Sequence, residues 1–265
     1  MYNRVAKIND MIESPKEVEL IRGFAGENHF FYDYIYKWSR MIKICKELGL
    51  HESGKQIVEL GGGLAPIQFI LANQGCKIYN LDLFPDSAWF PTNGKFYVGA
   101  SAEFIEESKK NIHNISFITG DILTTIKNIP ANSIDAALDT CALHQFVSDE
   151  LMHEIERVLK PGGYMISIGD VANPHLGGHD VEFYYPLDLM KMLTVNDNLK
   201  LIEPYDYETW ESELINTDNI IPRKYIDYNN LSLMNMKNTP SSIQYGNIPR
   251  LNINLWTATY VLRKS

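Results

Sequence analysis

Short apolar runs alternate along this chain with longer segments of helical spacing, and this alternation constrains the fold more than any other feature. Parallel strands need a long crossover, usually a helix, before the next strand begins. We expect strands over 56–60, 77–83, 115–121, 134–140, 164–170 and 251–263, and helices over 29–50, 66–75, 101–114 and 148–163. The sequence therefore predicts an α/β fold with a doubly wound, mostly parallel Rossmann-like sheet.

Local signals define several ends of these elements. Ser101 is placed to cap the helix over 101–114, because a serine oxygen accepts a hydrogen bond from a free amide of the first turn. Pro161 and the two glycines after it are expected to stop the helix over 148–163.

Three stretches do not fit the alternation: the amphipathic N-terminus, residues 84–100, and a long, polar, tyrosine-bearing segment before the last strand. A connection of that length is uncommon inside a compact domain unless it is a lid or a binding loop. We read all three as cap elements over the ligand-binding edge of the sheet. The expected division is an N-terminal helical cap at 1–50, an α/β core at 51–204, a lid or insertion at 205–250 and a final core strand at 251–265.

Composition excludes several classes of function. The net charge of −9 argues against wide contact with nucleic-acid phosphates, which requires a basic face. The three cysteines are scattered without a Cys-x-x-Cys pair, so neither a disulfide framework nor a zinc site is expected. His175 and His179 have metal-ligand spacing but no clear third ligand, and we read them as loop residues. The N-terminus has no signal-peptide core and no run is long enough to cross a membrane, which predicts a soluble, cytoplasmic protein.

Gly61, Gly62 and Gly63 stand between the first expected strand and its helix. Ligands of doubly wound sheets bind at such turns, where glycine lets a ligand approach the backbone. A merely tight turn would need one glycine, so we interpret the three as a ligand cradle. A dinucleotide fingerprint would need a third spaced glycine where Pro66 stands, and Glu59 would repel a pyrophosphate. The same carboxylate suits a ligand that carries positive charge.

The stretch from Glu59 to Ala65, Glu-Leu-Gly-Gly-Gly-Leu-Ala, resembles the first motif of the class I S-adenosylmethionine-dependent methyltransferases. It departs from that motif by having Ala65 where the family often has a third glycine. The resemblance extends from about residue 55 to residue 170 and includes 134–146, similar to the family's fourth-strand segment, and 159–163, similar to the turn before its fifth strand. It implies S-adenosyl-L-methionine as the cofactor, held in part by Glu59, Gly61, Gly62 and Gly63.

Further cofactor contacts follow from the resemblance. Asp82, with Leu83 beside it, matches the acidic residue that holds both ribose hydroxyls in the family, whereas the alternative is a turn or capping residue. Asp121 and Ile122 match the residues along the adenine edge, although Gly-Asp is also a common turn pair.

Methyl transfer depends mainly on alignment and on an unprotonated nucleophile. Asp139 is a candidate for holding the methionine ammonium, orienting a substrate amine or accepting its proton. His144 titrates in the range of a general base, but a surface or capping histidine is an equal alternative. Asp170, at the end of the fifth strand, is a second candidate at the same edge. Tyrosines of the segment 29–38 are further candidates for ligand contact.

The predicted function is methyl transfer to a small-molecule or peptide acceptor, with a slight preference for N-methylation of an amine because the strand ends are acidic. Members of the family with lids often act in natural-product pathways. The alternatives are O-methylation of a small metabolite, a nucleotide-dependent oxidoreductase, and a non-catalytic cofactor-binding protein. No metal, nucleic-acid or membrane partner is expected, and the sequence does not indicate the oligomeric state.

Overall fold

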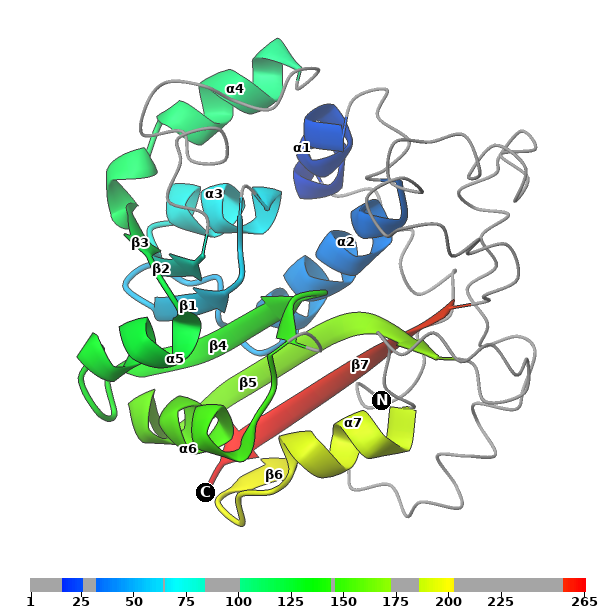
Figure 1. Ribbon diagram of the computed structural model, residues 1–265. Helices are drawn as coiled ribbons and strands as arrows, with labels where there is room; N and C mark the ends of the chain where they lie inside the picture. The colour runs from blue at the N-terminus through cyan, green and yellow to red at the C-terminus, as the bar shows by residue number, and fades with distance from the viewer. Residues whose placement is uncertain are drawn as a thin grey trace.

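The computed structural model describes residues 16–25, 32–63, 65–83, 101–143, 146–172, 186–202 and 255–265. Within these residues the chain forms one sheet with the strand order β3-β2-β1-β4-β5-β7-β6 (Figure 1). The strands are β1 (Gln56–Leu60), β2 (Lys77–Asp82), β3 (Ile115–Thr119), β4 (Ile134–Thr140), β5 (Leu159–Ala172), β6 (Leu199–Leu201) and β7 (Leu255–Lys264). The helices are α1 (Lys16–Ala25), α2 (Tyr32–Glu47), α3 (Pro66–Asn73), α4 (Ala102–Lys109), η4 (Ile112–Asn114), α5 (Ile122–Thr125), η5 (Ile126–Asn128), α6 (Asp149–Val158) and α7 (Pro186–Leu193).

Strands β1 to β5 pair in parallel, and β7 runs antiparallel to both β5 and β6. The chain builds outward from β1 through β2 to β3, then returns to place β4 on the other side of β1. This reversal creates a topological switch point between β1 and β4, which is where ligands bind in open α/β sheets. The predicted doubly wound, mostly parallel fold is confirmed. Helix α7 and strand β6 were not expected from the sequence.

Each face of the sheet has its own apolar core. Helices α1 to α4 cover one face, and α5, α6 and α7 cover the other (Figure 1). Strand residues alternate between the two cores: Ile57 faces α1 to α4 and Val58 faces the opposite helices. Side chains buried this completely each stabilise the fold by roughly 1.5–3 kcal/mol.

An aromatic cluster joins the helices of the first face. Phe24 of α1 packs edge-on against Trp38 of α2 at 5.4 Å between ring centroids, and lies 5.1 Å from Phe104 of α4. Phe69 of α3 packs edge-on against Phe104 at 5.9 Å. Helices α1 and α2 thus share the core of the sheet. The division into a cap at 1–50, a core at 51–204 and a lid at 205–250 stays a prediction, and both 84–100 and 203–254 lie outside the described residues.

The expected end of the helix over 148–163 was wrong. Ser148 caps α6 by accepting from the amide of Leu151, but the helix ends at Val158, before Pro161. The chain enters β5 at Leu159, and the register shifts by the time Tyr164 pairs with Ala136. The Lys-Pro-Gly-Gly sequence forms this irregularity. Its last glycine is required because a Cβ on Gly163 would lie 2.9 Å from a backbone oxygen.

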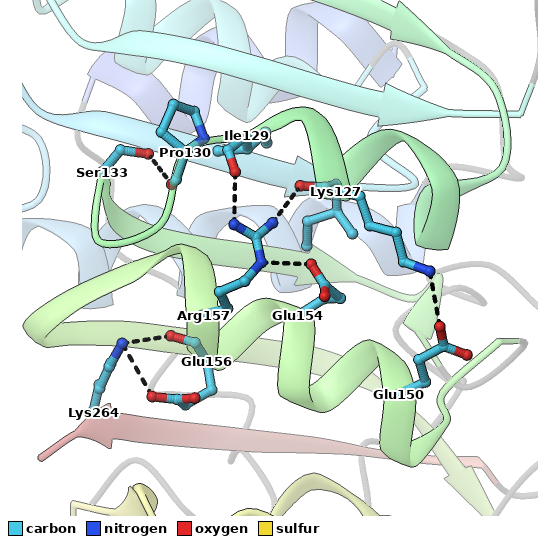
Figure 2. Close-up of polar contacts among 10 residues, drawn as sticks. Lys127, Ile129, Pro130, Ser133, Glu150, Glu154, Glu156, Arg157 and Lys264 are labelled. Carbon is cyan, nitrogen blue, oxygen red and sulfur yellow. Dashed lines mark hydrogen bonds and ion pairs between the residues drawn. The ribbon is translucent and has the colours of Figure 1, made fainter.

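Polar contacts hold α6 in place at the end of the sheet where β4 and β5 begin (Figure 2). The Arg157 guanidinium donates to Glu154 and to the carbonyls of Ile126 and Ile129. The Lys264 ammonium donates to the carbonyls of Glu156 and Leu159, a favourable position for a cation at a helix C-terminus. The Ser101 cap is confirmed, with its oxygen accepting from the amide of Phe104.

Candidate functional site

Two carboxylates flank the end of β1. Leu60 is in register with Leu81 of β2 on one side and with Asp139 of β4 on the other, and Asp82 follows Leu81. All three strands are parallel, so their carboxyl ends meet at one edge of the sheet. Asp82 and Asp139 are both buried there.

The glycine turn connects this edge to α3. Gly61 and Gly63 have φ values of +63° and +46°, a region that residues with a Cβ seldom adopt. A Cβ on Gly61 would lie 2.5 Å from the Cβ of Ala142, and one on Gly62 would lie 2.7 Å from the Glu59 carboxyl carbon. Of the three, only Gly63 leaves room among the described residues, where the nearest neighbour of its Cβ would be an Asp82 oxygen at 3.9 Å. Close packing within the protein therefore accounts for two of the glycines, and Gly63 is the one that leaves space for a ligand.

Side chains hold both backbone polar groups of Gly63, its amide and its carbonyl. Its amide donates to Asp82 Oδ2 at 2.9 Å. Its carbonyl accepts from Asn80 Nδ2 at 2.8 Å and from Gln68 Nε2 at 3.0 Å. Asn80 also donates to Gln68 Oε1 at 2.8 Å, which links strand β2 to helix α3. Side chains of β2 and α3 thus hold the backbone of the turn at Gly63.

Glu59 lies buried beneath this turn with 2% of its surface exposed. Neither of its carboxyl oxygens has a hydrogen-bond partner among the described residues. Burial raises the pKa of Glu59 well above its ordinary value, and the charges of Asp82 and Asp139 raise it further. The expectation that Glu59 acts as a charge is therefore opposed by its surroundings.

Asp139 accepts three hydrogen bonds from within the protein. Its Oδ1 accepts from the amides of Ala142 and Leu143 at 2.9 and 2.8 Å, and its Oδ2 accepts from the Ser167 hydroxyl at 2.6 Å. Burial raises its pKa to about 6, while these three hydrogen bonds oppose the rise. These contacts anchor the chain after β4, where Cys141 adopts a φ of +60°. Asp139 therefore orders the loop that packs against the glycine turn.

The predicted adenine residues lie one strand further out. Asp121 caps α5, and its Oδ1 accepts from the amide and hydroxyl of Thr124. Ile122 is buried in the core with 5% exposure, whereas Leu83 at the end of β2 is 58% exposed. In the structure Asp121 therefore acts as a capping residue, the alternative considered from the sequence. Its contact with the adenine of a cofactor stays a prediction.

Several candidates cannot be placed. His144, His175 and His179 lie outside the described residues, as do the side chains of the tyrosines at 32–36. Asp170 is part of β5 in register with Thr257, but its side chain also lies outside.

Asn80, Gln68 and Ser167 were missed by the sequence analysis. Each is a polar residue within an apolar run and is buried in the structure. Because buried polar groups are almost always hydrogen-bonded, an asparagine in a buried strand and a glutamine in the apolar helix Pro-Ile-Gln-Phe-Ile-Leu signal a specific partner. Their nearness to the glycine turn was the available signal.

Buried acidic side chains gather at the carboxyl ends of β1, β2 and β4, next to hydrogen-bond acceptors for which the described residues supply no donor. Glu59, Asp82 and Asp139 come from three adjacent strands. Like the oxygens of Glu59, Asn80 Oδ1 has no partner among the residues that the structure describes. The carboxylates of Asp82 and Asp139 favour a ligand with positive charge and oppose a pyrophosphate. S-adenosylmethionine, with a sulfonium and an ammonium, fits this chemistry.

Comparison with protein families decides the assignment. The family model described as "Methyltransferase domain" matches residues 51–183, half of the chain. The chain belongs to this methyltransferase family. As a methyltransferase it uses S-adenosylmethionine as the methyl donor, which confirms the cofactor expected from the resemblance and decides against a nucleotide-dependent oxidoreductase.

Solved structures of methyltransferases share the fold at low sequence identity. A phosphoethanolamine N-methyltransferase 2 of Haemonchus contortus in complex with S-adenosyl-L-methionine aligns with a TM-score of 0.54 at 15% identity over 93% of this chain. The alignment spans only 56% of that protein. A protein of Galdieria sulphuraria, titled a putative sarcosine dimethylglycine methyltransferase, gives 0.53 at 18% identity, covering 86% of this chain and 85% of the other. A geranyl diphosphate C-methyltransferase of Streptomyces coelicolor A3(2) gives 0.53 at 12% identity, with 100% and 90% covered.

No curated protein sequence matches the methyltransferase significantly. Among the helices of the described residues, none combines the length and the apolar character that crossing a membrane requires.

Proposed function

We propose that this methyltransferase transfers the methyl group of S-adenosylmethionine to an amine on a small-molecule or peptide acceptor. One observation carries the choice of an amine: the buried carboxylates of Asp82 on β2 and Asp139 on β4 gather at the edge of the sheet where the acceptor must approach. Their negative charge would attract an ammonium and repel a carboxylate or a phosphate. O-methylation of a small metabolite is the alternative that this observation disfavours.

In this proposal the cofactor lies across the carboxyl ends of β1 and β2. The open side of Gly63 receives its amino-acid end, and Asp82, beside Leu83, accepts from the ribose hydroxyls. Asp121 and the backbone of Ile122 border the adenine. The cofactor supplies an activated methyl group, so the protein contributes mainly alignment.

The remaining candidates act on the acceptor. Asp139 serves as a positioning residue, because its three hydrogen bonds fix the loop that runs toward His144. His144 and Asp170 are the proposed groups that orient the amine and take its proton, since an ammonium must lose a proton before it attacks. The segment 205–250 is the proposed lid, which would exclude water from the reaction.

The structural neighbours give mixed support. Two of them name amine substrates, phosphoethanolamine and sarcosine or dimethylglycine, whereas a third names geranyl diphosphate as the substrate of a C-methyltransferase. The sharing of a fold does not decide between these acceptors.

The test is a panel of acceptors assayed by release of S-adenosylhomocysteine. The panel contains small primary and secondary amines, an amine-bearing peptide, catechols, carboxylates and a prenyl diphosphate. We expect turnover with amines only, at a rate that increases with pH as the amine is deprotonated. Turnover with a phenol or a prenyl diphosphate and none with any amine would refute the proposal. Cofactor binding without turnover on any acceptor would favour the non-catalytic alternative.

A further inference from the structure

The hydrogen bonds around Gly63 fix how the Asn80 side chain is oriented. Both N–H groups of Asn80 are used, one toward the Gly63 carbonyl and one toward Gln68 Oε1, each at 2.8 Å. The opposite orientation would turn the Asn80 oxygen toward two other acceptors. Asn80 Oδ1 can therefore only accept, and it is buried with no donor in the described part of the chain.

Glu59 is the second group that lacks a donor. The Glu59 carboxyl carbon and Asn80 Oδ1 lie 2.7 and 3.0 Å from the same point, the position that a Cβ on Gly62 would take. If Glu59 were ionised, its carboxylate oxygens would face the Asn80 oxygen, so hydrogen-bond acceptors would meet without a donor in a site shielded from water. One proton on Glu59 gives the Asn80 oxygen a donor and removes a buried charge.

We propose that Glu59 is a neutral carboxylic acid whose O–H donates to the side-chain carbonyl of Asn80, and that it positions the Gly63 peptide as a hydrogen-bond donor instead of attracting the cofactor as a negative charge. The chain of contacts runs from Glu59 to Asn80 and on to the Gly63 carbonyl, with Gln68 as a second support. The proposal rests on the proposed placement of the cofactor at Gly63.

The charged and titratable groups that act on Glu59 favour this state. Asp82 of β2 and Asp139 of β4 both oppose its ionisation. Cys45 of α2 also interacts with Glu59, and burial raises the pKa of that thiol, so it stays neutral. Within the described residues, no cation is among the groups that shift the pKa of Glu59.

The first test compares two substitutions by calorimetric titration with S-adenosylhomocysteine. Glu59→Gln keeps the shape and supplies an N–H donor to Asn80, so we expect the Kd to stay within about threefold of wild type. Glu59→Met has similar volume but no donor, and we expect it to weaken binding at least tenfold, about 1.4 kcal/mol. A loss of tenfold or more in Glu59→Gln would overturn the proposal, because that result requires the charge.

The second test needs no cofactor, and it decides the protonation state even if Glu59→Met does not fold. An acid whose pKa is raised by folding binds more protons in the folded state, so its contribution to stability falls as pH rises above the unfolded value of about 4.5. We expect the urea midpoint of Glu59→Gln to rise relative to wild type between pH 5 and pH 8. A constant difference would mean that Glu59 does not carry the proton. Unchanged affinity in both Glu59→Met and Asp82→Ala would instead overturn the placement of the cofactor.

Discussion

The Oδ2 oxygen of Asp82 accepts a hydrogen bond of 2.9 Å from the backbone amide of Gly63. This contact joins the end of β2 to the turn after β1, the two segments that the resemblance assigns to the ribose and to the amino-acid end of the cofactor. One carboxylate therefore both shapes the glycine turn and stands in the proposed sugar site. Removing it should affect binding through both routes.

Asp82→Ala is expected to weaken binding of S-adenosylhomocysteine at least tenfold, about 1.4 kcal/mol or more, while the fold is retained. Asp82→Asn keeps an oxygen that can accept from Gly63, so it should lose less. Isothermal calorimetry measures both, with circular dichroism to verify the fold. Asp188→Ala on the exposed side of α7 is the matched control and should bind like wild type. Equal affinity of Asp82→Ala and this control would remove Asp82 from the ribose site.

Gly61→Ala should destabilise the protein more than Gly63→Ala. Both substitutions strain a positive φ, at a cost of about 1–2 kcal/mol, but only the first also drives a methyl group into Ala142. Overpacking of this kind adds about 1–3 kcal/mol. Gly63→Ala should mainly reduce cofactor affinity, because its methyl group enters the space proposed for the ligand. Urea unfolding and calorimetry separate the two effects.

The double variant Gly61→Ala with Ala142→Gly tests the cause of the first loss. Removing the Ala142 methyl group should restore part of the stability, giving a favourable coupling between the two sites. Strictly additive losses would indicate that backbone strain alone makes Gly61 necessary.

The sequence predicted the sheet well because its strands are buried on both faces and read as continuous apolar runs. It predicted the end of α6 poorly because Pro161 and Gly162 suggested the stop. In the structure Leu159 already belongs to β5, paired with Ile134, and strand pairing overrides the local signal.

At the candidate site, the sequence identified the acids but not how they are used. Asp139 appeared as a candidate base, yet it accepts from the amides of Ala142 and Leu143, three and four residues along, and from Ser167, which becomes its neighbour only when β4 and β5 pair. Such long-range pairing leaves no local spacing pattern. The glycines raised the same difficulty, because the neighbour that requires Gly61 is Ala142, far along the chain.

The buried Asp139 should make stability depend on pH. Its pKa is raised from 3.8 to about 6, mainly by burial, so the folded state binds more protons than the unfolded state between these values. The contribution of Asp139 to stability should therefore fall as pH rises from about 4 to 6 and then level off. Asp139→Asn lacks this titrating group. Its free energy of unfolding, relative to that of wild type, should therefore increase by about 3 kcal/mol as the pH rises across this range. Urea midpoints at pH 4, 5, 6 and 7 provide the measurement.

Ser167→Ala offers a check on the same carboxyl group. The serine hydroxyl stabilises the ionised form, so its removal should raise the pKa of Asp139 further and extend the fall in stability to higher pH. A pH profile that is the same in wild type, Asp139→Asn and Ser167→Ala would assign the titration to another group.

Lys264→Met should destabilise the protein without altering cofactor affinity. The buried ammonium donates to Asn132 Oδ1 and to the carbonyls of Glu156 and Leu159. These contacts lie where β4 and β5 begin, at the opposite end of the strands from the glycine turn, and Figure 2 draws the contact with Glu156. Leaving these acceptors unpaired should cost about 1–3 kcal/mol, measured by urea unfolding. Lys200→Met, at an exposed position on β6, is the matched control and should stay within about 0.5 kcal/mol of wild type. Because Lys264 lies outside the proposed site, a tenfold change in the Kd for S-adenosylhomocysteine in Lys264→Met would contradict the separation of the two ends of the sheet. An unchanged Kd alongside reduced stability would support this separation. It would also show that a loss of stability of this size does not by itself weaken cofactor binding.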